Sequence, residues 1–186
     1  MTYEDGRSAT TPPGVCPEPM SWETLRRIVE DGSLEQMRRL GRSEATLQSY
    51  HEFKARTAKF YESPMDLIMI KVFKCDWTVN DNNKFVHVPV SRSSEQKGPF
   101  FVPNDFPYHT VHGIEHWILW SDRVLDRREV RAFLRADSTA RGAAAQLTFV
   151  NPVELQSIPD VHHVHVMLLS ASAAELIDAD VPPPTP

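Results

Sequence analysis

The segment that most constrains the fold is residues 161–168, close to the C-terminal end of the chain, which read VHHVHVML. Side chains of a β-strand alternate between the two faces of a sheet. In such a strand His163 and His165 lie on one face, and Val164 and Val166 lie on the other. Two imidazoles on a rigid and otherwise apolar strand predict a functional site, because imidazole acts as a base, a nucleophile or a metal ligand near neutral pH.

The length and composition are those of one globular domain. The chain has 186 residues, of which 41% are hydrophobic and 24% are charged, so it can bury a substantial core. The net charge of −5 argues against a general nucleic-acid binder, since backbone phosphates require a basic surface. Cys16 and Cys75 are the only cysteines, which excludes a disulfide framework. No apolar run approaches the ~20 residues that span a bilayer, and the N-terminus has no signal pattern. We expect a cytoplasmic protein without a membrane or nucleic-acid partner.

Proline marks both ends of the chain. Residues 1–20 are predicted to be disordered, because this segment is rich in proline and poor in apolar side chains. Residues 173–186 are predicted to form a proline-rich tail that ends in VPPPTP. A single folded domain is therefore expected over residues 21–172.

The apolar spacing and turn residues between these ends predict helices first and strands later. We expect helices starting at Ser21, Ser33 and Ser43, with the third running to Tyr61 and Pro64 ending it, and another from Asp126 to about residue 135. The strands expected are 67–73, 85–88, 116–120, 146–150 and 161–169, with a polar loop over 91–99. This order favours an α+β fold with a mainly antiparallel sheet partly covered by helices.

Candidate ligand-binding residues precede the histidine strand. An Asn104-Asp105 turn between prolines exposes side-chain oxygens, and Tyr108 follows it. The next strand begins with His116 and ends with Trp120. An aromatic face such as that of Trp120 suits stacking on a base or a sugar ring. The alternative is that the turn only terminates a strand and that His116 and Trp120 belong to the core.

Two short polar residues lie at the entrance to the same strand. Asn151 is twelve residues and Ser157 six residues before His163. Side chains of this kind orient a phosphate or an imidazole, and they also form ordinary turns beside proline. We include both residues in the predicted ligand site.

Over residues 60–170 the chain resembles the fungal N-acetylglucosamine-induced protein 1 family. The resemblance rests on NDFPY at 104–108, HWILW at 116–120, NP at 151–152, SIP at 157–159 and HVHV at 163–166. It implies a link to amino-sugar or nucleotide-sugar metabolism, so the expected ligand is a nucleotide or a nucleotide sugar.

The same segments resemble a divergent histidine-triad nucleotide hydrolase or transferase, in which three histidines alternate with apolar residues on a strand. The resemblance implies a histidine-triad-like fold, with His163 as the nucleophile that attacks an α-phosphate and His165 as the third histidine. Val161 then occupies the place of the first histidine, which is a departure. The other register makes His165 the nucleophile and places Met167 third. With one triad member missing, cleavage and binding alone both stay open.

A metal site is the competing hypothesis. His163 and His165 also resemble the His-x-His pair of cupin-type centres, and His109, His112 or His116 could supply a third nitrogen. The cupin pattern also requires a glutamate shortly after the pair, and this chain has none there. We therefore expect neither a metal nor another cofactor. A non-catalytic regulatory module is the remaining alternative.

Overall fold

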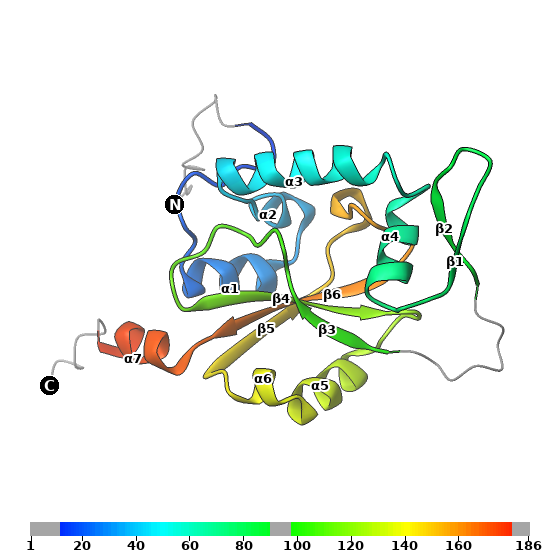
Figure 1. Ribbon diagram of the computed structural model, residues 1–186. Coiled ribbons are helices and arrows are strands. Elements are labelled where there is room, and N and C mark those ends of the chain that lie inside the picture. Colours follow the sequence, from blue (N-terminus) through cyan, green and yellow to red (C-terminus); the bar gives the residue numbers. More distant parts are fainter. Residues whose placement is uncertain (1–11, 90–97, 180–186) are drawn as a thin grey trace, which may run out of the picture.

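The computed structural model describes residues 12–89 and 98–179, and an antiparallel β-sheet forms its centre (Figure 1). Within these residues the sheet has four strands in the order β3, β4, β6, β5. The strands are β3 (Phe100–Pro103), β4 (Ile114–Ser121), β5 (Ala145–Phe149) and β6 (His162–Leu169). The predicted α+β class, with a mainly antiparallel sheet partly covered by helices, is confirmed.

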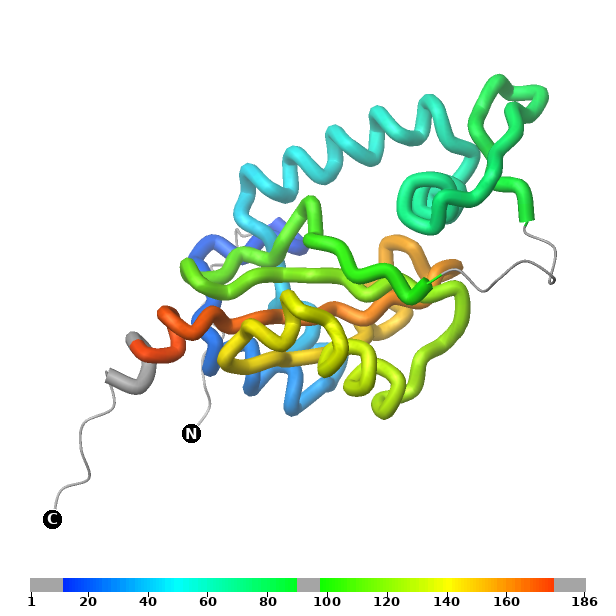
Figure 2. The backbone as a smooth tube through the Cα atoms, turned by 60° about the horizontal axis from the view of Figure 1, so that its bottom comes forward, coloured from blue at the N-terminus to red at the C-terminus, as the bar shows by residue number. Residues whose placement is uncertain are grey.

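Helices cover both faces of this sheet, with α1 to α4 on one side and α5 and α6 on the other (Figure 1). The helices are α1 (Trp22–Asp31), α2 (Leu34–Met37), α3 (Glu44–Thr57), α4 (Pro64–Lys71), α5 (Arg127–Ala136), α6 (Ser138–Arg141), the 3₁₀ turn η1 (Val153–Leu155) and α7 (Ala171–Ala179). A hairpin of β1 (Trp77–Val79) and β2 (Phe85–His87) projects at one end of the molecule, and α7 lies at the other (Figure 2). None of the helices in the described ranges combines the length and the apolar character needed to cross a membrane.

The register of the sheet defines the histidine face. Residues directly opposite one another in an antiparallel pair share a face. His165 lies opposite Ile118 on β4 and Phe149 on β5, and His163 lies opposite Trp120. These five side chains therefore belong to one face, as strand alternation predicts for the two histidines.

Hydrophobic clusters close both faces of the sheet, and the histidine face has two of them, one of which contains Ile118 and Trp120 and packs on α4. The face away from the histidines packs on α5 and α6, and its buried members are Leu119, Val130, Leu134, Ala140, Val164, Val166 and Leu168. The histidine face packs on α1 and α2, and its buried members include Leu25, Ile28, Met37, Tyr108, Phe149, Met167 and Leu169. Packing on both faces explains why β6 is apolar along its whole length apart from the histidines.

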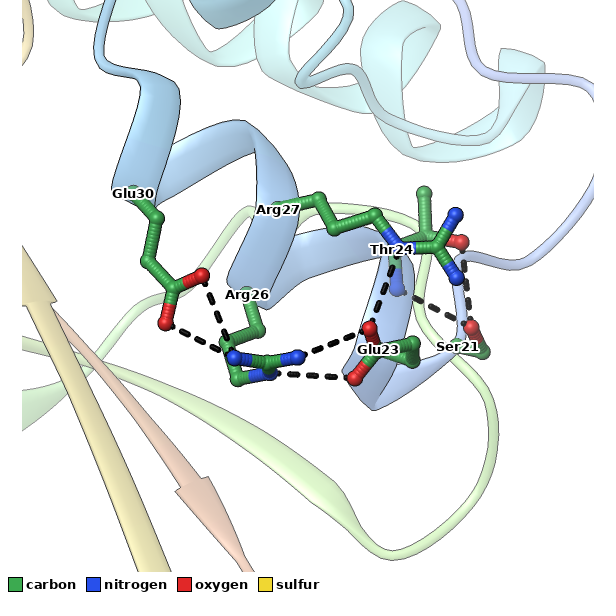
Figure 3. Close-up of polar contacts among 6 residues, drawn as sticks. All are labelled: Ser21, Glu23, Thr24, Arg26, Arg27 and Glu30. Carbon is green, nitrogen blue, oxygen red and sulfur yellow. Dashed lines mark hydrogen bonds and ion pairs between the residues drawn. The ribbon is translucent and has the colours of Figure 1, made fainter.

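Helix α1 illustrates how local chemistry sets the helix starts. The hydroxyl of Ser21 accepts the backbone N–H of Thr24 at 3.2 Å, as an N-cap serine does (Figure 3). On the exposed side, Arg26 lies 2.9 Å from Glu23 and 2.9 Å from Glu30. Exposed pairs of this kind contribute little, and the helix is held mainly by its buried face.

The predicted strand over residues 67–73 is wrong. These residues belong largely to helix α4, which begins at Pro64 after the N-cap Ser63. The Ser63 hydroxyl accepts the backbone N–H of Asp66 at 3.1 Å, and proline is favoured in the first turn of a helix. Pro64 therefore starts α4 and does not end α3, which stops at Thr57. The run of Leu, Ile and Met has no strand alternation, and its capping residues decide the outcome.

Two short strands, β1 and β3, are not predicted from the sequence. Strand β3 lies at the edge of the main sheet just before the Asn104 turn, and β1 pairs with β2 in the hairpin. Trp77, at the start of β1, is 53% exposed, and its ring meets that of Phe85 edge-on with centroids 4.8 Å apart. Strands of three or four residues are too short to show a period.

Both ends of the predicted domain extend further than expected. In the segment 12–20, predicted to be disordered, Val15 and Met20 are buried. The backbone N–H of Cys16 donates to the carbonyl of Arg42 at 2.7 Å, which joins this segment to the loop before α3. At the other end, α7 occupies the start of the predicted proline-rich tail. The rest of the predicted N-terminal segment, most of the polar loop and the end of the tail lie outside the described residues.

Candidate functional site

Three buried histidines form the centre of the site. His116 comes from β4, and His163 and His165 come from β6. The ring centroids of His116 and His165 are 5.1 Å apart, and those of His163 and His165 are 5.4 Å apart. Each residue is only 5–6% exposed. The histidine that follows the Asn104 turn thus contacts His165, and His165 in turn contacts His163, although His116 is far from both in the sequence.

His163 has a defined tautomer. Its Nδ1 lies 2.8 Å from the carbonyl oxygen of Val161, which can only accept, so Nδ1 carries the proton. Burial lowers the pKa of His163, and the bond to Val161 offsets only part of that effect. The imidazole is therefore neutral at pH 7 and its Nε2 holds a lone pair. Among the described residues Nε2 has no hydrogen-bond partner, and the ring of Trp120 lies 4.8 Å from the imidazole ring.

A chain of hydrogen bonds fixes the protons on the other two histidines. The backbone N–H of Tyr108 donates to Nδ1 of His116 at 3.1 Å, so the proton of neutral His116 lies on Nε2. That Nε2–H donates to Nδ1 of His165 at 2.9 Å. The remaining proton of His165 is then on its Nε2.

Asn151 closes this chain. Its side-chain amide lies 3.1 Å from Nε2 of His165 and 3.0 Å from the hydroxyl of Tyr108. Since Nε2 of His165 is a donor, it needs an acceptor, which we assign to the amide oxygen of Asn151. When the amide nitrogen of Asn151 faces His165 and Tyr108, the amide oxygen Oδ1 is buried without a hydrogen-bond partner. The reversed amide gives Oδ1 two donors, from His165 and Tyr108.

Burial makes the network resistant to protonation. It lowers the pKa of His116 to about 3 and that of His165 well below its ordinary value, and the positive charge of Arg42 adds to both effects. Burial likewise raises the pKa of the Tyr108 phenol. All these groups are neutral over the physiological range, so the network holds its side chains in place without formal charge.

Arg42 is the residue of the site that the sequence reading missed. Its Nε–H donates to the carbonyl of Phe106 at 2.9 Å, and its guanidinium lies 4.5 Å from the ring centroid of Tyr50 and 5.7 Å from that of Tyr108. No local pattern marks this position. The pairing of Arg42 with Val15 and the cap of α3 place it here.

The remaining predicted site residues divide into two groups. Asn104 lies beside the network, since its amide nitrogen is 3.3 Å from Nδ1 of His116, and its oxygen accepts the backbone N–H of Phe106 at 3.0 Å. Asp105 and Ser157 are both exposed. Neither has a hydrogen bond or ring contact with the histidines in the described part of the chain. The structure therefore brings Asn104, Tyr108, His116, Trp120, Asn151, His163 and His165 together, and leaves Asp105 and Ser157 apart.

An open pocket of about 530 Å³ reaches one end of the network. It is lined by Asn104, Tyr108, His116, Glu115 and Trp117 among others, and its volume is within the usual range for ligand pockets. His163 and His165 do not line it. The pocket and the unpartnered Nε2 of His163 are thus two separate features of the site.

The histidines are not arranged as a metal centre. Across residues 12–89 and 98–179, no group of three or more His, Cys, Asp or Glu side chains could hold a metal ion. Of the third ligands proposed for the cupin-like alternative, His109 uses its Nδ1 on the carbonyl of Cys16 at 2.7 Å, and His112 is exposed. His116 is close, but it is hydrogen-bonded to His165 directly.

A histidine–aspartate pair, His87 and Asp66, lies outside this site. Both the ring Nδ1–H of His87 and its backbone N–H donate to Oδ1 of Asp66, at 2.6 and 2.9 Å, and the Ser63 hydroxyl donates to Oδ2 at 2.6 Å. Burial alone would raise the pKa of Asp66, but these bonds outweigh it and lower the pKa. The pair ties the β1–β2 hairpin to α4.

The sequence comparisons place the chain in a family. A family model described as "Protein of unknown function (DUF3605)" matches residues 21–169, which include the whole histidine network. The chain belongs to the DUF3605 family. A relative is the "Uncharacterized protein YPL067C" of Saccharomyces cerevisiae, which is 31% identical over 162 residues, or 79% of this chain and 77% of that protein. A solved structure, "Crystal Structure of HTC1", is similar with a TM-score of 0.58 and 27% identity, covering 86% of this chain and 94% of that one.

Proposed function

We propose that this family member binds a nucleotide or a nucleotide sugar and acts as a phosphoryl or nucleotidyl hydrolase or transferase, with His163 as the nucleophile. The observation that carries the proposal is the bond from Nδ1–H of His163 to the carbonyl of Val161. It fixes the tautomer that leaves the Nε2 lone pair available, which is the form in which an imidazole attacks phosphorus. The link to amino-sugar metabolism rests on the family resemblance alone, and it makes uridine-diphosphate sugars the first ligands to test.

The chemistry proceeds in two displacements. The Nε2 lone pair of His163 attacks the α-phosphorus, an N–P bond forms, and the bond from that phosphorus to the bridging oxygen breaks. The leaving group departs with the bonding electrons as a phosphate ester and needs no proton. Water or an acceptor hydroxyl then attacks the same phosphorus, loses its proton to solvent, and releases His163 as the neutral imidazole.

The neighbours of His163 on the same face of the sheet support this role. His165 lies next to it on the same face and is anchored by His116 and Asn151. These partners are neutral and buried, so they fix the position of His165 beside the nucleophile without adding formal charge to the site. The position of the missing first histidine is filled by Val161, whose carbonyl is the group that orients His163.

The burial of His163 sets a condition on turnover. The residue is 6% exposed and does not line the pocket beside Asn104, so a phosphate reaches Nε2 only when the side chains around it shift. The ring of Trp120 is the aromatic neighbour in contact with it. We expect turnover to be slow and to increase when Trp120 is replaced by leucine.

Binding without cleavage is the second candidate function. It is favoured by the pocket beside Asn104, Tyr108 and His116, which is open and large enough for a ligand although the nucleophile does not line it. A regulatory module that senses a nucleotide sugar needs only this pocket. The two functions differ in whether Nε2 of His163 becomes bonded to phosphorus.

The test is the variant His163→Asn, because the amide nitrogen of asparagine replaces Nδ1 as the donor to Val161 while Nε2 is lost. The matched control is His162→Asn, on the opposite face of β6. Wild-type and variant proteins are incubated with a nucleotide sugar labelled at the α-phosphate, and release of the nucleoside monophosphate and label retained on denatured protein are measured. Binding is measured in the same samples as the increase in melting temperature caused by the ligand.

Loss of turnover and of label in His163→Asn, with binding and the His162→Asn control unchanged, supports the hydrolase or transferase. Wild-type protein that binds the ligand but never releases product or retains label establishes the binding module instead. No stabilisation by any nucleotide or nucleotide sugar at millimolar concentration contradicts both functions.

A further inference from the structure

A second pocket lies between α3, α4 and the segment after η1, away from the histidine network. Its volume is about 160 Å³, and Tyr50, Phe53, Tyr61, Leu67 and Ile158 supply most of its apolar wall. An apolar cavity on the order of 150 Å³ is enough to bind a benzene molecule. The pocket therefore has room for one six-membered ring.

The aromatic side chains that line the pocket are held in place by further aromatic rings. The rings of Tyr50 and Phe53 pack against Phe106, with centroids 5.3 and 5.1 Å apart, and the ring of Tyr61 packs against Phe85 at 5.6 Å. These three ring pairs are tilted, and their centroid separations are those of aromatic pairs in contact. The pocket is thus preformed, so binding of a ring requires little ordering of the protein and has a small conformational entropy cost.

The charged side chains that line the pocket are two lysines and one glutamate, which gives a net positive charge. Lys54 and Lys84 line it, and Nζ of Lys54 lies 5.5 Å from the ring centroid of Tyr50. Neither lysine forms an ion pair with any residue that the structure describes. The carboxylate in the lining, Glu62, already accepts a hydrogen bond from the Asn80 amide at 3.0 Å.

A further cation lies behind the same wall. The guanidinium of Arg42 lies 4.5 Å from the ring centroid of Tyr50, so this ring has two cations against it. The ring face attracts these cations, and the cations in turn attract an anionic group that lies close by. The pocket combines an apolar ring-sized interior with a cationic mouth.

We infer that this pocket binds a single aromatic ring that carries a negatively charged group, such as an aryl carboxylate or an aryl phosphate. The ring inserts between Tyr50, Phe53 and Leu67, and the anion lies at the mouth beside Lys54 and Lys84. The inference does not depend on His163, which does not line the pocket.

The test measures binding of phenyl phosphate and benzoate to the full chain by titration calorimetry, with benzyl alcohol and inorganic phosphate as the ring and the anion alone. Lys54→Met removes the charge and keeps the apolar stem. Its control is Lys59→Met, an exposed lysine close by that does not line the pocket. Leu67→Phe fills the interior, and His163→Asn separates this site from the proposed chemistry.

We expect phenyl phosphate to bind more tightly than either part alone. Lys54→Met should weaken its binding about two- to fivefold, the size of one exposed ion pair, and should leave benzyl alcohol unchanged. Leu67→Phe should weaken both, while Lys59→Met and His163→Asn should weaken neither. Failure of both aryl anions to bind at millimolar concentration would overturn the inference. Equal effects of the two lysine variants would overturn it too, as would phosphate binding as well as phenyl phosphate.

Discussion

At the scale of single residues, Asn151 is the acceptor that completes the hydrogen-bond chain of the histidine network. It is 7% exposed and is the side chain that meets both Nε2 of His165 and the hydroxyl of Tyr108. The assignment of its oxygen to these two donors makes Asn151 an obligatory acceptor. A residue of the same size without hydrogen-bonding groups leaves both donors buried and unpaired.

We therefore expect Asn151→Leu to destabilise the protein by about 1–3 kcal/mol for each unpaired group. The measurement is the free energy of unfolding in urea. The control is Asn104→Ala, at the half-buried rim of the pocket, which should cost less. Equal stability of Asn151→Leu and the wild type would show that the amide is not an essential acceptor.

The sequence predicts which residues form this network better than it predicts how deeply they are buried. Strand alternation places His163 and His165 on one face, and the motif order correctly brings His116, Asn104 and Asn151 to them. Alternation cannot tell a face that lines a cleft from a face covered by helices, so the burial of the histidines was not foreseen. Arg42 could not be found, because a long-range backbone bridge brings it to the site.

At the scale of elements, the contact between Asp66 and His87 attaches the β1–β2 hairpin to α4. Asp66 is 4% exposed and accepts from Ser63 and from both nitrogen donors of His87. Two of these residues, Ser63 and Asp66, explain the wrong strand prediction. The cap at Ser63 and the buried carboxylate of Asp66 favour a helix, whereas the following apolar run favours a strand by composition alone.

Asp66→Asn should release the hairpin without unfolding the sheet, because the amide cannot accept from both Ser63 and His87 as an anion does. We expect a local loss of about 1–3 kcal/mol. Hydrogen exchange should show faster exchange at residues 77–79 and 85–87, with β4 and β6 unchanged. Uniformly faster exchange over the whole chain would contradict a local role.

At the scale of the whole molecule, the buried histidines make stability depend on pH. The pKa values of His116, His163 and His165 are all lowered in the folded state, so the unfolded chain binds more protons below its ordinary histidine pKa of about 6.5. The stability from the neutral network is complete above that pH. It is lost as the pH falls from there towards about 3, the folded pKa of His116.

Each such histidine changes the free energy of unfolding by up to about 1.4 kcal/mol per pH unit in this window. Urea unfolding of the wild type should therefore show a steep decrease in stability between pH 6.5 and 5, and a flat profile above pH 7. The lowered pKa of Asp66 acts only below its ordinary value of 3.8, so it does not contribute there. A profile that is flat from pH 7 to 5 would contradict the neutral network.

The most direct test of the central claim is the tautomer of His163, read from the nitrogen shifts of ¹⁵N-labelled imidazoles at pH 7. The account predicts that His163 is neutral with its proton on Nδ1, held by Val161, and that His116 and His165 are neutral with protons on Nε2. A His163 that is protonated on Nε2, or doubly protonated at this pH, has no lone pair on Nε2 to attack phosphorus and would contradict the proposed function.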